Sequence, residues 1–263
     1  MFDFHMHSSV SFDSTEEAIN MVKAAENLGL KEICFTDHYD FNSEKDGHHD
    51  LYTKEQYLAA YNDLTSPSVK IRRGVEFGLT PWNKNELNAY LRMLPQTDFV
   101  LGSVHYVGGT DPYFKEFWQG RDFRSAIDSY LEQVLICVKA HDNFDVLGHL
   151  TYVCKSAYNP LGKGIAYSEV CDVVDEILRT LVYKGKGIEI NTSGIDRIGE
   201  FLPTDEYLKR FRELGGEIVT VGSDAHDATR VGQYNKEAIK LIGEYFPYVC
   251  TFKDRTPVFN KIV

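Results

Sequence analysis

Two histidines two residues apart, His5 and His7, follow a short apolar run at the beginning of the chain. Successive side chains of a β-strand point to opposite faces, so both imidazoles would project from the same face. Such a pair can hold one metal ion between them, although two surface histidines on an edge strand would give the same pattern. The pair therefore predicts the first half of a metal site.

Five other apolar runs also end in side chains that bind metal ions. These runs lead to Asp37 with His38, to Glu76, to His105, to His149, and to Asp224 with His226. For any one of them, capping of a helix or bonding to buried backbone groups is an equally good explanation. That explanation does not account for all of them together, so we expect these side chains to share a site.

Segments with helical periodicity lie between the apolar runs. The first predicted helix covers residues 18–28, with Ser14 as its N-terminal cap and Gly29 as its stop. The remaining predicted helices, each between two apolar runs, cover residues 54–65, 84–94, 123–141, 167–184, 204–214 and 235–246. One more apolar run at 187–191 brings the pattern to seven strands and seven helices.

Strands that alternate with helices predict an α/β fold with right-handed crossovers and parallel strands. Seven such units favour a closed or nearly closed barrel over an open sheet. Every candidate ligand falls at the C-terminal end of its run or just past it, and in parallel barrels that end carries the active site. No linker-like segment divides the chain, so residues 1–263 are predicted to form one domain.

Composition narrows the partners and the location that we expect. The formal net charge of -11 argues against long nucleic acid or an anionic membrane as partner, because both favour dense Lys and Arg. The sequence has no membrane-spanning run and no signal-peptide pattern, so a cytoplasmic protein is predicted. Five cysteines without a close-spaced pair indicate buried or incidental thiols, and a ligand role is conceivable for Cys154, which lies five residues after His149. The oligomeric state stays open.

The candidate ligands are imidazoles and carboxylates without thiolates, a set that suits zinc, manganese or iron. They outnumber the ligands of one ion, and a carboxylate such as Glu76 can bridge two, so two or three divalent ions are expected. Ions about 3.5–4 Å apart supply hydroxide at neutral pH and stabilise the attacking and leaving oxygens of a displacement at phosphorus. The predicted chemistry is phosphoester hydrolysis.

These motifs, in this order, resemble those of the polymerase and histidinol phosphatase (PHP) family. The resemblance spans residues 5 to 226 and rests on His5-Met6-His7, Asp13, Thr36-Asp37-His38, Gly74-Val75-Glu76, Ser103-Val104-His105, Gly148-His149 and Ser223-Asp224-Ala225-His226. It implies a distorted seven-stranded (β/α)7 barrel with a three-ion site at the C-terminal face.

Carried over residue by residue, the resemblance implies three ion positions. The first would be held by His5, His7, Glu76 and Asp224, the second by Glu76, His105 and His149, and the third by Asp13, His38 and His226. Many members have a histidine where this chain has Asp13, a departure that would weaken or retune the third position.

Within the family, the chain length and the segment His149-Leu150-Thr151-Tyr152 are similar to those of histidinol-phosphate phosphatases. The resemblance then implies hydrolysis of a small phosphomonoester, L-histidinol phosphate, in histidine biosynthesis. A hydroxide that bridges two ions would attack phosphorus. The residues expected to take part in catalysis are Glu76, Asp224, His226 and Arg197.

Arg197, after the sixth predicted strand, is the first candidate for the phosphate group of a substrate, because arginine offers a planar fork to oxyanions. A solvated loop arginine is the alternative. The other candidates for contact with the phosphate or the substrate body, all in loops after predicted strands, are Lys155, Tyr158 and Arg230. The candidates for the wall around the amino and ring groups are Asp40, Phe41 and Trp118.

Three further histidines are not expected to bind ions or substrate. His48 and His49 lie in a polar segment that is typical of a surface loop. His141 ends a long predicted helix, where a cation would interact favourably with the helix dipole, so a structural role is expected.

Three alternative functions remain open from the sequence. One is a phosphoesterase of the same family that acts on nucleotides or nucleic-acid 3′ ends. Another is a noncatalytic metal-binding regulatory protein on the same barrel, because a fold does not fix a function. The third is an amidohydrolase-like barrel enzyme, which also opens with a His-x-His strand but usually adds a lysine ligand and an eighth strand.

Overall fold

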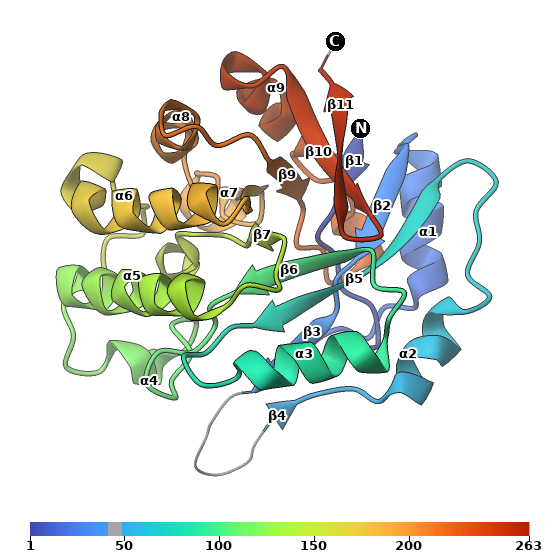
Figure 1. The fold of residues 1–263 in the computed structure, drawn as a ribbon, viewed down its shortest axis with the longest axis horizontal. Coiled ribbons are helices and arrows are strands. Elements are labelled where there is room, and N and C mark those ends of the chain that lie inside the picture. The colour runs from blue at the N-terminus through green and yellow to red at the C-terminus, as the bar shows by residue number, and fades with distance from the viewer. Residues whose placement is uncertain (42–48, 263) are drawn as a thin grey trace.

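The computed structural model describes residues 1–41 and 49–262 and contains the predicted barrel of parallel strands (Figure 1). Its strands lie in the order β1 (Phe2–Asp3), β2 (Glu32–Phe35), β5 (Lys70–Gly78), β6 (Phe99–Ser103), β7 (Val146–Leu147), β8 (Gly187–Asn191) and β9 (Val219–Gly222). All six neighbouring pairs are parallel, and helices surround the strands in Figure 1. The predicted seven-stranded α/β barrel is confirmed.

The chain segments that follow β1 and β9 bring the two ends of the sheet together. The Phe4 amide donates to the Val221 carbonyl at 2.9 Å, and the Asp224 amide donates to the His5 carbonyl at 2.8 Å. The His7 amide donates to the Ala225 carbonyl, also at 2.8 Å. Because of this closure, the first and last predicted motifs lie side by side although more than two hundred residues separate them.

Each predicted helix is present in the structure. The long helices are α1 (Ala18–Asn27), α2 (Lys54–Tyr61), α3 (Lys84–Met93), α5 (Phe123–Ala140), α6 (Tyr167–Tyr183), α8 (Asp205–Glu213) and α9 (Asn235–Tyr245). Within the described part of the chain, none of the helices is long and apolar enough to cross a membrane.

The prediction that Ser14 caps the first helix is wrong. Glu17 is the N-cap of α1, and its side chain makes no capping bond. Ser14 Oγ instead donates to the His226 carbonyl at 2.8 Å, across the junction between the two ends of the chain. The same Oγ accepts a hydrogen bond from the Glu16 amide at 3.2 Å, so its local bond forms a turn ahead of α1, which begins four residues after Ser14.

The sequence did not predict several short elements. They are β3 (His38–Phe41), β4 (His49–Asp50), α4 (Lys115–Trp118), η1 (Tyr152–Lys155), α7 (Ile195–Ile198) and η2 (Ala228–Arg230). Strand β3 pairs with β5 in parallel and with β4 in antiparallel orientation. Most of these elements follow a barrel strand, so they form the rim of the C-terminal face.

A C-terminal hairpin of β10 (Tyr248–Lys253) and β11 (Thr256–Lys261) was also not predicted. Cys250 and Phe252 of β10 pack in one cluster with Phe4, Phe99 and other apolar residues of the barrel strands. These barrel residues precede the candidate ligands on their strands. The hairpin therefore closes the end of the barrel opposite the candidate site.

Gly222 ends β9 in a space that has no room for a side chain. A β-carbon at position 222 would lie 2.3 Å from Glu189 Oε1 and 2.3 Å from His5 Cβ. We expect Gly222→Ala to lower the free energy of unfolding by about 1–3 kcal/mol through overpacking, as measured by urea unfolding. Gly243→Ala, at an exposed position of α9, should change it by less than about 1 kcal/mol. Equal effects at the two positions would contradict the packing described for Gly222.

Candidate metal centre

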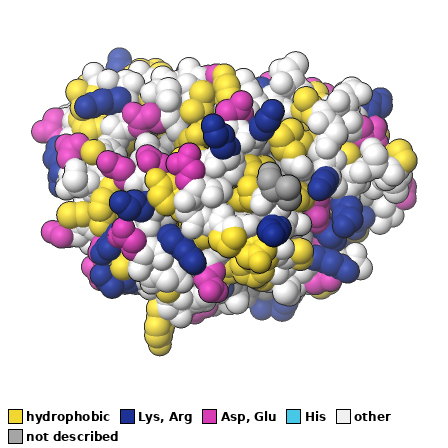
Figure 2. Space-filling model, turned by 90° about the horizontal axis from the view of Figure 1, so that it is seen from above, with side chains coloured by type: hydrophobic (Ala, Val, Ile, Leu, Met, Phe, Trp, Pro, Cys, Tyr) yellow, Lys and Arg dark blue, Asp and Glu magenta, His cyan; other side chains and the backbone are white. Residues whose placement is uncertain are grey.

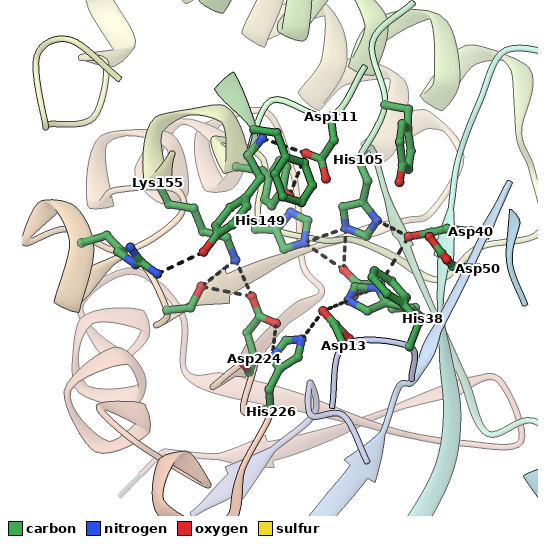
Figure 3. Close-up of a pocket in the computed structure, with 18 of the residues that line it drawn as sticks. Asp13, His38, Asp40, Asp50, His105, Asp111, His149, Lys155, Asp224 and His226 are labelled. Atoms are coloured by element: carbon green, nitrogen blue, oxygen red, sulfur yellow. Dashed lines mark hydrogen bonds and ion pairs between the residues drawn. The ribbon is translucent and has the colours of Figure 1, made fainter. Parts of the chain in front are cut away.

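The C-terminal face of the barrel opens into a cavity of about 840 Å³. Seven of the nine predicted ligands line it, namely Asp13, His38, Glu76, His105, His149, Asp224 and His226. The other two, His5 and His7, are fully buried and lie within hydrogen-bonding distance of Glu76. Figure 3 shows side chains from distant parts of the chain converging on this cavity.

His5, His7, Glu76 and Asp224 form the first cluster of donor atoms. Glu76 Oε2 lies 3.1 Å from His5 Nε2 and 3.5 Å from His7 Nε2, and these two nitrogens are 3.1 Å apart. Asp224 Oδ1 lies 3.5 Å from His5 Nε2 and 3.3 Å from His7 Nε2. A tetrahedron of ligands at zinc-ligand distances has edges of about 3.3 Å. Five of the six distances among the four donor atoms are therefore close to those that one tetrahedral ion requires.

The second cluster joins Glu76 to His105 and His149. Glu76 Oε1 lies 2.8 Å from His149 Nε2 and 3.2 Å from His105 Nε2, and the two nitrogens are 3.4 Å apart. The two oxygens of Glu76 thus face different clusters, which is the arrangement that a bridging carboxylate requires. Both histidines also line the cavity, so a ligand there has access to this cluster.

The third cluster contains Asp13, His38 and His226. Asp13 Oδ2 lies 3.0 Å from His226 Nε2 and 3.5 Å from His38 Nε2, while His38 Nδ1 lies 3.0 Å from Glu76 Oε2. The side chains of Asp13 and His226 are 34% and 31% exposed, whereas those of the first cluster are almost fully buried. The third position is therefore the one most open to solvent.

The carboxylates of the clusters are held in their anionic form. Burial raises the pKa of Glu76, but the imidazoles of His5 and His105 outweigh it and hold the pKa well below its ordinary value. For Asp224, Lys155 and His5 likewise outweigh burial and lower the pKa. Anionic carboxylates at the centre of an imidazole cluster suit divalent cations.

Several imidazoles in these clusters use their second nitrogen in contacts outside the clusters. His105 Nδ1 lies 2.9 Å from Asp40 Oδ2, and His7 Nδ1 lies 3.1 Å from Ser11 Oγ. Contacts of this kind fix the ring so that Nε2 faces the cluster. From the sequence, Asp40 was a candidate only for the substrate wall, and Ser11 was not a candidate.

Three of the predicted substrate-binding side chains line the cavity. Arg197 lies on α7, is exposed, and donates from Nη2 to the Tyr113 hydroxyl at 3.0 Å. Lys155 ends η1 with its side chain 13% exposed, and its Nζ lies 2.7 Å from Asp224 Oδ2. Arg230 ends η2 and donates to Asp196 Oδ2 at 2.7 Å.

Of the other predicted contacts, Asp40 lines the cavity, whereas Tyr158, Phe41 and Trp118 do not. Tyr158 is 48% exposed, and neither Tyr158 nor Phe41 is among the described residues that line the cavity. Trp118 is buried, and its Nε1 donates to the Pro112 carbonyl at 2.9 Å, so its contacts are structural. Cys154 lies in the core, where burial raises the pKa of its thiol to about 12.

The structure describes two of the three histidines that were not expected to bind ions or substrate. His141 is buried at the end of α5, where its Nε2 lies 2.8 Å from the Thr80 carbonyl oxygen, so a structural role fits. Burial lowers the pKa of His141, which disfavours the cationic form that was predicted from its place at the end of a helix. His48 lies outside the described residues, and His49 begins β4.

The basic residues of the cavity wall lie on one side of it, where Asp196 and Asp224 pair with two of them. The basic residues Lys155, Arg197 and Arg230 follow β7, β8 and β9, which are neighbours in the barrel. The acidic residues Asp40, Asp50 and Asp111 lie on β3, on β4 and in the segment after β6, beside β5. In Figure 3, Asp40 and Asp50 lie on the far side of His149 from Lys155. The cavity thus suits a ligand with an anionic end and a cationic end.

Comparisons with known proteins agree with this geometry. The family model described as "PHP domain" matches residues 3–193. A histidinol-phosphatase of Lactococcus lactis subsp. lactis is 35% identical over 233 residues, which are 87% of this chain and 85% of the relative. A probable histidinol-phosphatase of Clostridium acetobutylicum is 32% identical over 241 residues, which are 92% of each chain.

Solved structures show the same likeness. One is the histidinol phosphate phosphatase of Lactococcus lactis subsp. lactis complexed with zinc, L-histidinol and phosphate, with a TM-score of 0.86 and 31% identity over 98% of each chain. Another is a putative histidinol phosphatase of Listeria monocytogenes, with a TM-score of 0.74, 19% identity, and coverage of 90% of this chain and 99% of that one. At that identity, the second likeness supports the fold alone.

Proposed function

This chain belongs to the PHP domain family, and from that premise we propose that it is a metal-dependent phosphatase that hydrolyses L-histidinol phosphate to L-histidinol and phosphate. The observation that carries the proposal is a cavity in which Glu76 joins two clusters of donor atoms between a basic and an acidic wall. The Lactococcus relative, complexed with zinc, L-histidinol and phosphate, supports the same substrate.

We propose zinc as the metal and assign three ion positions to the three clusters. The spacing of donor atoms around His5, His7, Glu76 and Asp224 fits a tetrahedral ion, and zinc is present in the Lactococcus structure. When bound, the ions stabilise charge on the phosphoryl oxygens and activate water for attack at phosphorus. Elemental analysis of the purified protein will decide between zinc, manganese and iron and will count the ions.

The basic side of the cavity binds the phosphate group in this proposal. Lys155 and Arg197 donate to phosphate oxygens, and Lys155 also keeps the Asp224 carboxylate in place through its 2.7 Å contact. The acidic side binds the amino and imidazole groups of the substrate. Burial raises the pKa of the Asp111 carboxyl, and a substrate ammonium group beside it would stabilise its charged form.

Arg197 provides a test of the phosphate contact. We expect Arg197→Met to lower kcat/KM for histidinol phosphate by about 10–100-fold, because a hydrogen bond to a charged group contributes about 1.5–3 kcal/mol. The matched control is Arg179→Met, which removes an exposed arginine on α6 that pairs with Asp175. Steady-state kinetics of both variants is the measurement, and equal kcat/KM values for the two variants would remove Arg197 from the site.

A substrate panel tests the proposed function itself. Phosphate release is measured with L-histidinol phosphate, a nucleoside monophosphate and a generic aryl phosphate under the same conditions. We expect kcat/KM to be highest for L-histidinol phosphate, since only this substrate has a cationic end for the acidic wall. A preference for the nucleotide would favour the nucleotide phosphoesterase instead. No release from any of the three would favour a noncatalytic metal-binding protein.

The molecular surface does not favour long nucleic acid as substrate. On the face drawn in Figure 2, Lys and Arg side chains of the described residues are scattered among acidic and uncharged ones and form no continuous stripe. The net charge of -11 points the same way, because binding to a phosphate backbone depends on many basic contacts. A small phosphomonoester makes no such demand.

A further inference from the structure

Strand β8 contributes none of the predicted ligands, yet Glu189 at its centre contacts both of the buried clusters. Its side chain is 1% exposed. Glu189 Oε1 lies 2.7 Å from His5 Nδ1, and Oε2 accepts a hydrogen bond from the His149 backbone amide at 2.9 Å. Asn191 Nδ2, on the same strand, donates to Oε2 at 3.2 Å. One buried carboxylate thus joins a residue of the first cluster to one of the second.

We propose that Glu189 is a positioning residue that orients His5 for the first ion and ties its imidazole to the strand that carries His149. This inference rests on the metal-dependent function proposed above. A neutral imidazole carries one N–H, and a carboxylate at 2.7 Å from Nδ1 places the hydrogen there. His5 Nε2 then offers its lone pair to the cluster, where it lies 3.1 Å from Glu76 Oε2.

The contacts explain why a carboxylate is needed at this position. Glu189 accepts from three donors, which are the ring of His5, the amide of His149 and the side chain of Asn191. A glutamine has one accepting oxygen, so its NH₂ group would face a donor on one side or the other. The space for the carboxylate is kept by Gly222, whose added β-carbon would lie 2.3 Å from Glu189 Oε1.

Alternative roles for Glu189 fit the geometry less well. A direct ligand would face the cluster, but Glu189 approaches His5 at Nδ1, on the side of the ring away from Nε2. A substrate contact is also disfavoured, because Glu189 is buried and is not among the described residues that line the cavity. A purely structural carboxylate would not need to join two ligand-bearing segments.

The test measures metal affinity, and it needs no substrate. Metal-stripped wild type and Glu189→Gln are titrated with zinc in competition with a chromophoric chelator. We expect the tightest zinc ion to bind about 10–100-fold more weakly to the variant. The matched control is Glu32→Gln, which changes a buried glutamate of β2 paired with Arg72, and it should bind zinc as the wild type does. Wild-type affinity in a folded Glu189→Gln protein would overturn the proposal.

Two further measurements cover the case in which Glu189→Gln does not fold. Glu189→Asp keeps the charge but shortens the side chain, so it should also weaken zinc binding, and wild-type affinity in this variant would count against the proposal. In a crystal structure of the zinc-loaded wild type, His5 should bind zinc through Nε2 and donate from Nδ1 to Glu189. Zinc on Nδ1, or on Glu189 itself, would overturn the proposal. A protein that meets these expectations but does not hydrolyse histidinol phosphate would refute only the proposed substrate.

Discussion

Glu76→Gln should lower kcat for L-histidinol phosphate by about 10³-fold or more. The two oxygens of Glu76 face different clusters, with Oε2 toward His5 and His7 and Oε1 toward His105 and His149. An amide of the same size presents an NH₂ group to one cluster and loses the negative charge that both clusters share. A fall of about 10³-fold in kcat corresponds to a loss of about 4 kcal/mol in stabilisation of the transition state. Steady-state phosphate release is the measurement.

Two controls separate loss of the bridge from loss of the fold. Glu32→Gln makes the same chemical change at a buried strand position outside the cavity and should retain kcat. Elemental analysis of Glu76→Gln should find fewer bound ions than in wild type, while its circular dichroism spectrum stays unchanged. Wild-type turnover together with the full number of ions would show that Glu76 is not the bridge.

The convergence of the ligands could be predicted because it depends on rules that a single sequence carries. Alternation along a strand places His5 and His7 on one face, and parallel strands bring their C-terminal ends to one side of the barrel. Glu76 was recognised in the same way, although β5 continues for two residues beyond it. These rules need no knowledge of which strands are neighbours.

Contacts between distant segments could not be predicted in this way. Glu189 and His5 are 184 residues apart, and a glutamate in the run at 187–191 is equally compatible with a surface position on an edge strand. The only available signal was a charged residue between two isoleucines at the centre of a predicted strand. The prediction for Ser14 failed because α1 begins at Ala18, so the amide that bonds to the Ser14 hydroxyl, that of Glu16, lies before the helix.

The C-terminal hairpin lacked the turn signal that usually reveals one. Asp254 and Arg255 both have positive φ values, 49° and 61°, in a turn where Asn-Gly or Asp-Gly is the common sequence. Tertiary contacts stabilise this backbone instead. The Asp254 amide donates to Asp98 Oδ1 at 3.0 Å, and the Arg255 amide donates to the Asp98 carbonyl at 2.9 Å. Neither contact can be inferred from the residues near the turn.

Removal of the metal ions should abolish phosphate release and make the protein easier to unfold. We expect dialysis against a strong chelator to reduce turnover to background, since the ions would supply the activated water for attack at phosphorus. Ions that bind only the folded state stabilise it by about 2.7 kcal/mol when their free concentration is about 100 times the dissociation constant. For a chain of this size, the melting temperature should then fall by about 5–10 °C.

Restoring zinc should recover both turnover and the melting temperature, and the same thermal scan on Glu76→Gln should show a smaller response to the chelator. The smaller response is expected because the variant has lost the carboxylate that two clusters share. Full turnover in protein shown by elemental analysis to be free of metal would refute the metal-dependent function. A drop in melting temperature that zinc does not reverse would instead indicate that the chelator acts on the protein by another route.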